Sequence, residues 1–297
     1  IFNVSMNLGA YKSTTYAAEV ADLDNDGDLD IATGNDRAPN RIFLNDGEGN
    51  FTESGFFGAN YAPTRNLTLG DVDQDNDIDI IITNRGTKNE ICLNDGKGNF
   101  NEVLFFGEND DSTIDVELYD IDKDGDQDLI LANRDGQANF IYLNENLTFT
   151  KKIQFGTGKD ETRSVAIADF NKDGYPDLLA GNINEPNRIY FGTSDLNFSK
   201  SIELDTINDL TFSVDIADYD KDGDIDVLVA NNRAPNYVYK NSGDGTQFER
   251  IQLSSFDYRT YDIKFININK DNYPDIVEVN SDENNLFYYN LIPRKQK

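Results

Sequence analysis

The chain of 297 residues contains no histidine, no tryptophan and a single cysteine, Cys92. Without histidine, a catalytic triad and histidine-based general acid–base chemistry are excluded, and zinc is an unsuitable metal. One cysteine cannot form an intrachain disulfide, and we expect Cys92 to be a small core residue rather than a nucleophile. There is no run of 18 apolar residues, so the sequence predicts no membrane-spanning helix.

Basic residues are also scarce, with 26 Lys and Arg against 55 Asp and Glu and a formal net charge of −29. This surplus disfavours binding to nucleic acid or insertion into an anionic membrane. The hydrophobic fraction of 38% is still enough to build a core. Closely spaced carboxylates repel one another in a compact state, so a counter-charge is expected. The chain begins at Ile1 rather than at Met, as expected of a mature or trimmed fragment.

The main feature of the sequence is an internal repeat. Six nine-residue segments rich in Asp begin 49 residues apart, and we call them loops 1 to 6. They read DLDNDGDLD, DVDQDNDID, DIDKDGDQD, DFNKDGYPD, DYDKDGDID and NINKDNYPD, at residues 22–30, 71–79, 120–128, 169–177, 218–226 and 267–275. Such a period points to a repeat architecture that covers nearly the whole chain.

Alternating apolar residues precede each loop, and a short apolar run such as III or LIL follows it. These patterns predict a half-buried strand and then a strand buried on both faces. A third strand follows, as in NRIFLND from Asn40, and a fourth is expected near Phe51, Phe100, Phe149, Phe198 and Phe248. The prediction is an all-β, six-bladed β-propeller with four antiparallel strands per blade, as one domain of residues 1–297. The last repeat lacks a fourth strand, and we expect Phe2–Leu8 to complete that blade and close the ring.

The loops have the composition of a calcium site. Calcium takes six to eight hard oxygen ligands in flexible geometry, whereas magnesium demands a stricter octahedron. Acidic residues at positions 1, 3, 5 and 9 direct oxygens to one centre, position 7 commonly contributes its carbonyl, and position 6 is Gly or Asn, as a sharp turn requires. The flanking strands and the missing Glu at position 12 distinguish the loop from an EF-hand.

We therefore predict up to six Ca²⁺ ions, one per blade. Loop 6 offers two Asp where loops 1, 2, 3 and 5 offer four at these positions, so it should bind most weakly. The candidate ligands are Asp22, Asp24, Asp26, Asp28 and Asp30; Asp71, Asp73, Asp75, Asp77 and Asp79; Asp120, Asp122, Asp124, Asp126 and Asp128; Asp169, Asn171, Asp173, Tyr175 and Asp177; Asp218, Asp220, Asp222, Asp224 and Asp226; Asn267, Asn269, Asp271, Tyr273 and Asp275.

The motif D-x-D-x-D-G-x-x-D before an apolar strand, together with NRIFLNDGEGNF, resembles the FG-GAP or VCBS repeat family. That family forms the calcium-loop propellers of integrin α-chain heads and of many bacterial surface proteins. The resemblance implies a calcium loop between the first and second strands of each blade, exposed on the lower face. Two features differ from integrins: six blades replace the typical seven, and the Phe-Gly signature survives only loosely, as at Phe57-Gly58.

The opposite face is the expected place for a ligand. An Asn recurs there every 49 residues, at Asn35, Asn84, Asn133, Asn182, Asn231 and Asn280. Seven arginines map to the same side, which we interpret as candidate contacts for an anionic glycan or protein segment. They are Arg37, Arg65, Arg85, Arg134, Arg163, Arg233 and Arg259. The alternative is that the Asn side chains cap turns and the Arg side chains pair with acids or stack on aromatic rings.

The sequence thus favours a noncatalytic adhesion or recognition module that calcium stabilises, without an enzymatic activity. Two alternatives stay open: a polysaccharide-processing enzyme resembling a lyase, which would use Tyr, Lys or Arg, and a purely structural spacer. Many extracellular modules bind calcium at the high levels found outside cells, so a secreted or cell-surface location is expected. We expect the domain to be monomeric.

Overall fold

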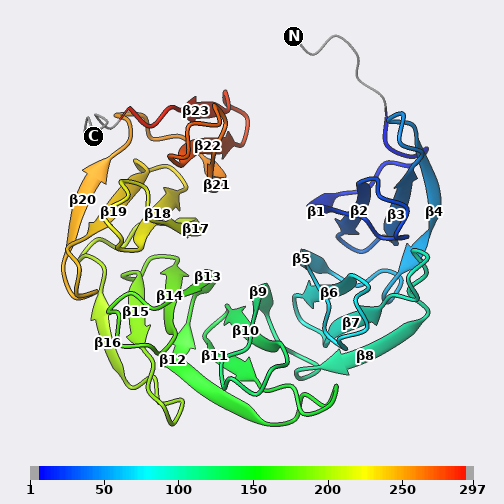
Figure 1. The fold of residues 1–297 in the computed structure, drawn as a ribbon, viewed down its shortest axis with the longest axis horizontal. Coiled ribbons are helices and arrows are strands. Elements are labelled where there is room, and N and C mark those ends of the chain that lie inside the picture. The colour runs from blue at the N-terminus through cyan, green and yellow to red at the C-terminus, as the bar shows by residue number, and fades with distance from the viewer. Residues whose placement is uncertain (1–6, 292–297) are drawn as a thin grey trace. The chain divides into compact units, whose positions relative to one another are not determined.

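The computed structural model describes residues 7–291, and none of them is helical. Their strands form six small antiparallel sheets, and the fold is that of a six-bladed β-propeller (Figure 1). In that part of the chain, no helix is long and apolar enough to cross a membrane. The predicted closing strand Phe2–Leu8 lies outside the described residues except for its last two, which belong to no strand.

Each 49-residue repeat supplies one blade, whose strands follow one another in sequence order. Blade 1 contains β1 (Thr15–Ala21), β2 (Asp30–Asn35), β3 (Asn40–Asn45) and β4 (Phe51–Phe57); blade 2 contains β5 (Thr64–Gly70), β6 (Asp79–Asn84), β7 (Asn89–Leu93) and β8 (Glu102–Phe106); blade 3 contains β9 (Thr113–Tyr119), β10 (Asp128–Asn133), β11 (Gln137–Tyr142) and β12 (Lys152–Asp160). Blade 4 contains β13 (Thr162–Ala168), β14 (Asp177–Asn182), β15 (Arg188–Phe191) and β16 (Lys200–Glu203); blade 5 contains β17 (Thr211–Ala217), β18 (Asp226–Asn231), β19 (Tyr237–Asn241) and β20 (Phe248–Gln252); blade 6 contains β21 (Thr260–Ile266), β22 (Asp275–Asn280) and β23 (Leu286–Tyr288).

The second strand is deeply buried in blades 2 to 5, as its apolar run predicts. Every residue of β6, β10, β14 and β18 is buried. Side chains that alternate along such a strand enter the two clusters on its two faces: Ile80 and Ile82 pack with blade 1, and Ile81 packs with blade 3. The core is therefore a series of layers between blades, each built by the period-two alternation of a strand.

The fourth strands begin later than the sequence indicates in three blades. The predictions near Phe51 and Phe248 are confirmed, whereas β8, β12 and β16 start two or three residues after the predicted phenylalanines. In these blades Phe100, Phe149 and Phe198 are buried residues that precede the strand. Burial of a large ring ahead of the strand gives the same apolar signal as a first strand residue, which explains the shift.

The chain divides into two compact units, residues 1–133 with 140–153 and residues 134–139 with 154–297. In the first unit β1 contacts β5 and β5 contacts β9; in the second, β13 contacts β17 and β17 contacts β21. Blade 1 opens the first unit, and the predicted apolar positions Ala18 and Val20 are exposed there. Their counterparts in blade 2 are Leu67, which is buried, and Leu69, which packs against the cluster shared with blade 1.

Candidate metal centres

The acidic loops connect the first and second strands of every blade, and each loop ends at the first residue of the second strand. Within loop 1, the carboxylate of Asp22 accepts the backbone N–H groups of Asp26 (3.1 Å) and Gly27 (3.0 Å). Asp26 in turn accepts the N–H of Asp28 (2.9 Å). These short-range bonds from aspartate to its own chain are what curl the loop into a tight turn. Closely similar bonds recur in the other loops.

Two positions of every loop adopt a left-handed backbone. Position 6, occupied by Gly or Asn, has φ between 71° and 103° in all six loops. A Cβ on Gly27 would meet nothing within 4 Å, so the glycine is required by its backbone conformation rather than by space. Position 4 is also left-handed, with φ of 60° at Asn25 and 64° at Lys123, and the sequence interpretation missed it. Lysine at position 4 in four loops hides the signal, since a left-handed lysine is uncommon.

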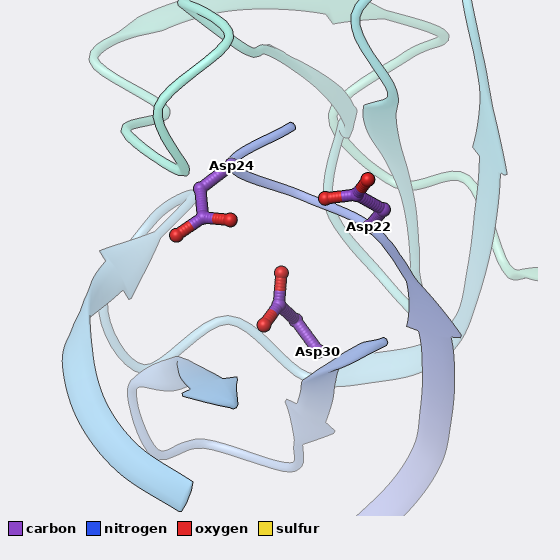
Figure 2. A group of neighbouring side chains, drawn as sticks. All are labelled: Asp22, Asp24 and Asp30. Carbon is purple, nitrogen blue, oxygen red and sulfur yellow. The ribbon is translucent and has the colours of Figure 1, made fainter. Parts of the chain in front are cut away.

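Positions 1, 3 and 9 bring their carboxylates together. In loop 1, oxygens of Asp22, Asp24 and Asp30 lie within 4.8 Å of one another, and Figure 2 shows the three groups directed at a common space. The same triads form in loops 2, 3 and 5, from Asp71, Asp73 and Asp79; Asp120, Asp122 and Asp128; and Asp218, Asp220 and Asp226. Three carboxylates at this spacing repel one another unless a cation lies between them.

The aspartate at position 9 has a second task that the sequence interpretation missed. Asp30 is fully buried, and its two oxygens accept the N–H of Leu23 (2.8 Å) and the N–H of Asn45 (2.8 Å). These bonds tie the loop to the end of the third strand. The same pair of bonds is present in all six blades. Only a carboxylate offers two acceptors in this geometry while keeping lone pairs for a metal, which explains Asp at position 9 of all six loops.

Burial also makes it less favourable for the aspartates at position 9 to be ionised. It raises the pKa of Asp79, Asp128 and Asp177 to about 6 and that of Asp226 to about 7, although backbone hydrogen bonds oppose the shift and neighbouring carboxylates add to it. In addition, Oδ1 of Asp24, Asp120 and Asp126 is buried without a hydrogen-bond partner among the described residues. Buried oxygens without donors, facing other carboxylates, fit a hard cation with oxygen ligands.

The other predicted ligands lie differently. At position 5, the carboxylates of Asp75 and Asp173 accept the N–H at position 7 and are outside the triads. At position 7, Asp28 and Asp77 lie against the turn glycines Gly47 and Gly96. Loops 4 and 6 have Asn at position 3, and Asn171 and Asn269 each donate to the Asp at position 5. Tyr175 is exposed and Tyr273 is half-buried.

The opposite end of each blade has the recurring Asn residues, and most of these are fully buried. The N–H of Asn84 donates to Asn89 Oδ1 (2.8 Å), and Asn89 Nδ2 donates to Thr113 Oγ1 of the next blade (2.9 Å). The hydroxyl of Thr64 donates to Asn84 Oδ1 (3.2 Å). We call this repeated pattern the asparagine–threonine network. In the second unit it continues through Asn187, Thr211, Asn231, Asn236, Thr260 and Asn280. These Asn side chains bind the fold together rather than face a ligand.

The seven candidate arginines differ in their surroundings. Arg65 pairs with Asp36 (3.0 Å) and lies over the ring of Tyr16, and Arg134 pairs with Glu161 (3.4 Å). Arg163 stacks on Phe212 and Tyr261. Arg259 pairs with Asp282 (3.3 Å) beside a shallow hollow lined by Tyr258, Asp282, Glu283 and Asn284, whose charge repels an anion. Arg85 is half-buried, whereas Arg37 and Arg233 are exposed.

Cys92 is completely buried in the layer between blades 1 and 2, as its apolar surroundings in the sequence indicate. Desolvation raises the pKa of its thiol far above its ordinary value, with the charge of Glu90 adding to the effect. A buried thiol that resists ionisation is a poor nucleophile.

A family model described as an FG-GAP-like repeat matches the chain five times in succession, over residues 22–82, 71–131, 120–180, 169–229 and 218–278. Each match begins at the first aspartate of a loop and runs through the loop of the following blade. The chain belongs to the FG-GAP-like repeat family. In this FG-GAP-like chain, the sequence resemblance to the family is thus confirmed. A search of curated proteins gave no match.

Solved structures share the fold at low sequence identity. A lectin from Agrocybe aegerita that recognises non-reducing terminal N-acetylglucosamine is similar with a TM-score of 0.61 and 20% identity, over 89% of this chain and 74% of the lectin. The biofilm matrix protein Bap1 of V. cholerae is similar with a TM-score of 0.52 and 19% identity, over 80% of this chain and 39% of Bap1. BBS1N, crystallised with ARL6DN, is similar with a TM-score of 0.53 and 10% identity, over 90% of both chains. These likenesses show that the propeller fold is shared.

Proposed function

We propose that this chain is a noncatalytic binding and adhesion module of a secreted or cell-surface protein, stabilised by calcium in its acidic loops. The observation that supports it most is the convergence of three carboxylates in four loops, with buried oxygens that lack protein donors. Positions 1, 3 and 9 would hold the ion. Bound calcium supplies positive charge and coordination to these oxygens, while the chain itself orients them through the backbone bonds of positions 1 and 9.

The proposed role of calcium is structural because each triad lies where a loop meets the buried second strand. Position 9 of loop 2, Asp79, ties that loop to Asn94 at the end of β7. An ion that neutralises Asp71, Asp73 and Asp79 therefore stabilises both the loop and the start of the central strand. A ligand that binds only the folded state at a hundred times its Kd contributes about 2.7 kcal/mol per site.

The proposed partner is an anionic glycan or an acidic protein segment, bound at the blade ends opposite the loops. Exposure makes Arg37 in blade 1 and Arg233 in blade 5 the best candidates, since four of the other arginines already pair with acids or stack on rings. Exposed guanidinium groups can form bidentate bonds to carboxylate or sulfate groups.

Calcium titration of the metal-stripped protein tests the first part of the proposal. We expect heat release on addition of CaCl₂, little on addition of MgCl₂, and an unfolding temperature at least about 10 °C higher in calcium than in EGTA, because several sites contribute. Equal unfolding temperatures in the two buffers would contradict a stabilising role.

A glycan and acidic-peptide binding screen in calcium tests the partner. Arg37→Ala and Arg233→Ala should weaken binding to any acidic hit, whereas Arg65→Ala, whose guanidinium is already paired, serves as the matched control. Unchanged binding in both variants would rule out these arginines. A protein that binds nothing in the screen would support a spacer, and turnover of an acidic polysaccharide would support an enzyme.

A further inference from the structure

Two lysine side chains make ion pairs with the carboxylates of loop 5. Lys240 on β19 makes ion pairs with Asp220 at position 3 and with Asp222 at position 5, the latter with Nζ 3.0 Å from Oδ2. Lys172 of loop 4 pairs with Asp224 at position 7. Asp220 belongs to the triad of loop 5, so the ammonium group of Lys240 contacts a predicted metal ligand directly.

The hydrogen bonds to position 9 show which residue is equivalent to Lys240 in each of the other blades. Lys240 directly precedes Asn241, whose N–H donates to Asp226 at position 9 of the loop (2.9 Å). The residues that precede the corresponding donor elsewhere are Leu44, Leu93, Leu143, Phe191 and Tyr289. None of them is charged, so the third strand does not need a lysine here. The fold tolerates leucine at this place in three blades, and of the six blades only blade 5 has lysine here.

We propose that Lys240 is a tethered counter-cation of loop 5, so that this loop is partly neutralised without calcium and binds calcium more weakly than loops 1 to 3. The comparison is between loops of equal acid content, since loops 1, 2, 3 and 5 all have Asp at positions 1, 3, 5 and 9. Calcium and the ammonium group compete for Asp220, and calcium enters only when the side chain of Lys240 moves away. Its side chain is 31% exposed, which leaves it room to leave the site toward solvent.

The inference rests on the proposed calcium function. It predicts that loops 1 to 3 and loop 5 differ in calcium affinity. Loops 1 to 3 would fill first, and loop 5 would fill at higher calcium concentration. Calcium must displace the ammonium group from Asp220 and Asp222, and the loss of these ion pairs costs roughly tenfold or more in affinity. The ammonium group also stabilises loop 5 in calcium-free protein, because it opposes the repulsion among the carboxylates of that triad.

The variant Lys240→Leu tests this directly, because leucine is the residue that blades 1, 2 and 3 have at this position. We expect two opposite effects. In EGTA the variant unfolds at a lower temperature than the wild-type protein, because the acids of loop 5 lose their counter-charge. In a calcium titration, one additional site moves into the affinity range of loops 1 to 3, a gain of about tenfold for that site.

Two control variants separate this role from a general effect of charge. Lys240→Arg keeps the cation and should behave like the wild-type protein in both measurements. Lys159→Leu removes an exposed lysine of β12, which lies outside the acidic loops, and it should change neither measurement. A Lys240→Leu variant with an unchanged calcium titration and an unchanged unfolding temperature in EGTA would overturn the proposal.

The failure of the general calcium proposal would look different. In that case the wild-type protein and every variant would show no heat of calcium binding, whatever the residue at position 240. The loss of stability of Lys240→Leu in EGTA would then still show that Lys240 neutralises loop 5. An unchanged stability in EGTA together with normal calcium binding would instead overturn only the inference about Lys240.

Discussion

At both ends of each blade, polar side chains lie next to the buried second strand and need hydrogen-bond partners or counter-charge. The two ends supply these in different ways. At the end opposite the loops, the asparagine–threonine network satisfies its buried amides and hydroxyls mainly with one another, as in Asn187, Thr211 and Asn231. At the loop end, carboxylates converge without enough donors, as at Asp24 and Asp120. A neutral network needs nothing from outside the protein, whereas a triad of anions needs a cation.

This difference predicts that the stability of the two ends responds differently to calcium. Damage to the asparagine–threonine network should cost the same free energy with or without the ion. Damage to a metal ligand should matter mainly when calcium is bound, unless that ligand also has a structural task. The four predictions below separate these cases.

The largest effect is expected for Asp79→Ala. This change removes the acceptor of two N–H groups, those of Val72 and Asn94, and leaves them buried. Each unsatisfied buried group costs about 1–3 kcal/mol, so we expect a loss of about 2–6 kcal/mol even in EGTA. Chemical denaturation with and without calcium measures it.

Asp71→Ala is the matched control in the same loop. Its partners, the N–H groups of Asp75 and Asn76, are exposed and can bond to water, so in EGTA the loss should be about 1 kcal/mol or less. If both variants lost equal stability in EGTA, position 9 would have no structural task of its own.

Thr211→Val should have the next largest effect. The hydroxyl of Thr211 accepts from Asn187 Nδ2 and donates to Asn231 Oδ1, each at 3.0 Å, in a fully buried setting. Valine has the same shape and leaves both partners unsatisfied, which costs about 2–4 kcal/mol. The loss should be the same in calcium and in EGTA. As the control, Thr52→Val changes an exposed residue and should cost less than about 0.5 kcal/mol. A calcium-dependent loss of stability for Thr211→Val would contradict the proposed difference between the two ends.

A smaller effect is expected from pH, with opposite signs in the two buffers. In calcium-free protein the pKa of Asp79 and Asp128 is raised by burial to about 6, above the value of about 3.9 in an unfolded chain. The folded state therefore binds more protons between pH 4 and 6, and its stability in EGTA falls as the pH rises through 6. In calcium the stability should rise over that range, because the ion binds only the ionised carboxylates.

Thermal unfolding at pH 5 and pH 7.5 in both buffers measures this effect. Asp79→Asn cannot titrate and should reduce the pH dependence in EGTA. Parallel pH profiles in calcium and EGTA would show that the ion does not bind these carboxylates.

The smallest effect is expected for Asn94→Ala, which sharpens the comparison at the loop end. Asn94 Nδ2 donates to the carbonyl of Leu23 in loop 1 (2.9 Å), while its backbone N–H donates to Asp79 of loop 2. The residue thus links two neighbouring loops. Blade 4 has Gly192 at this place, which has no side chain to make such a link. Loss of the side chain should cost about 1–2 kcal/mol and make calcium binding to loops 1 and 2 less cooperative in a titration. An unchanged titration would show that this bond does not couple the sites.

Much of the fold could be predicted because its strands and turns follow from patterns among neighbouring residues. Alternation along each strand predicts which side faces a neighbouring blade, and burial of Leu67, Val116 and Val214 confirms it. Gly27 and Asn76 at position 6 predict a turn that the backbone adopts. The start of β8 could not be predicted, because a buried Phe100 before the strand and a first strand residue give the same apolar signal.

By itself, the amino-acid sequence determined the six repeats, the strands around each loop and the residue types that can ligate a cation, because period, alternation and acid spacing are local properties. Only the tertiary structure decided which oxygens meet. It brought positions 1, 3 and 9 together, gave Asp30 two backbone partners, buried the recurring Asn residues in a network, and placed Lys240 against Asp220. Some of these contacts join different strands of a blade and others depend on how the loop folds back on itself, and residue spacing alone specifies neither distance.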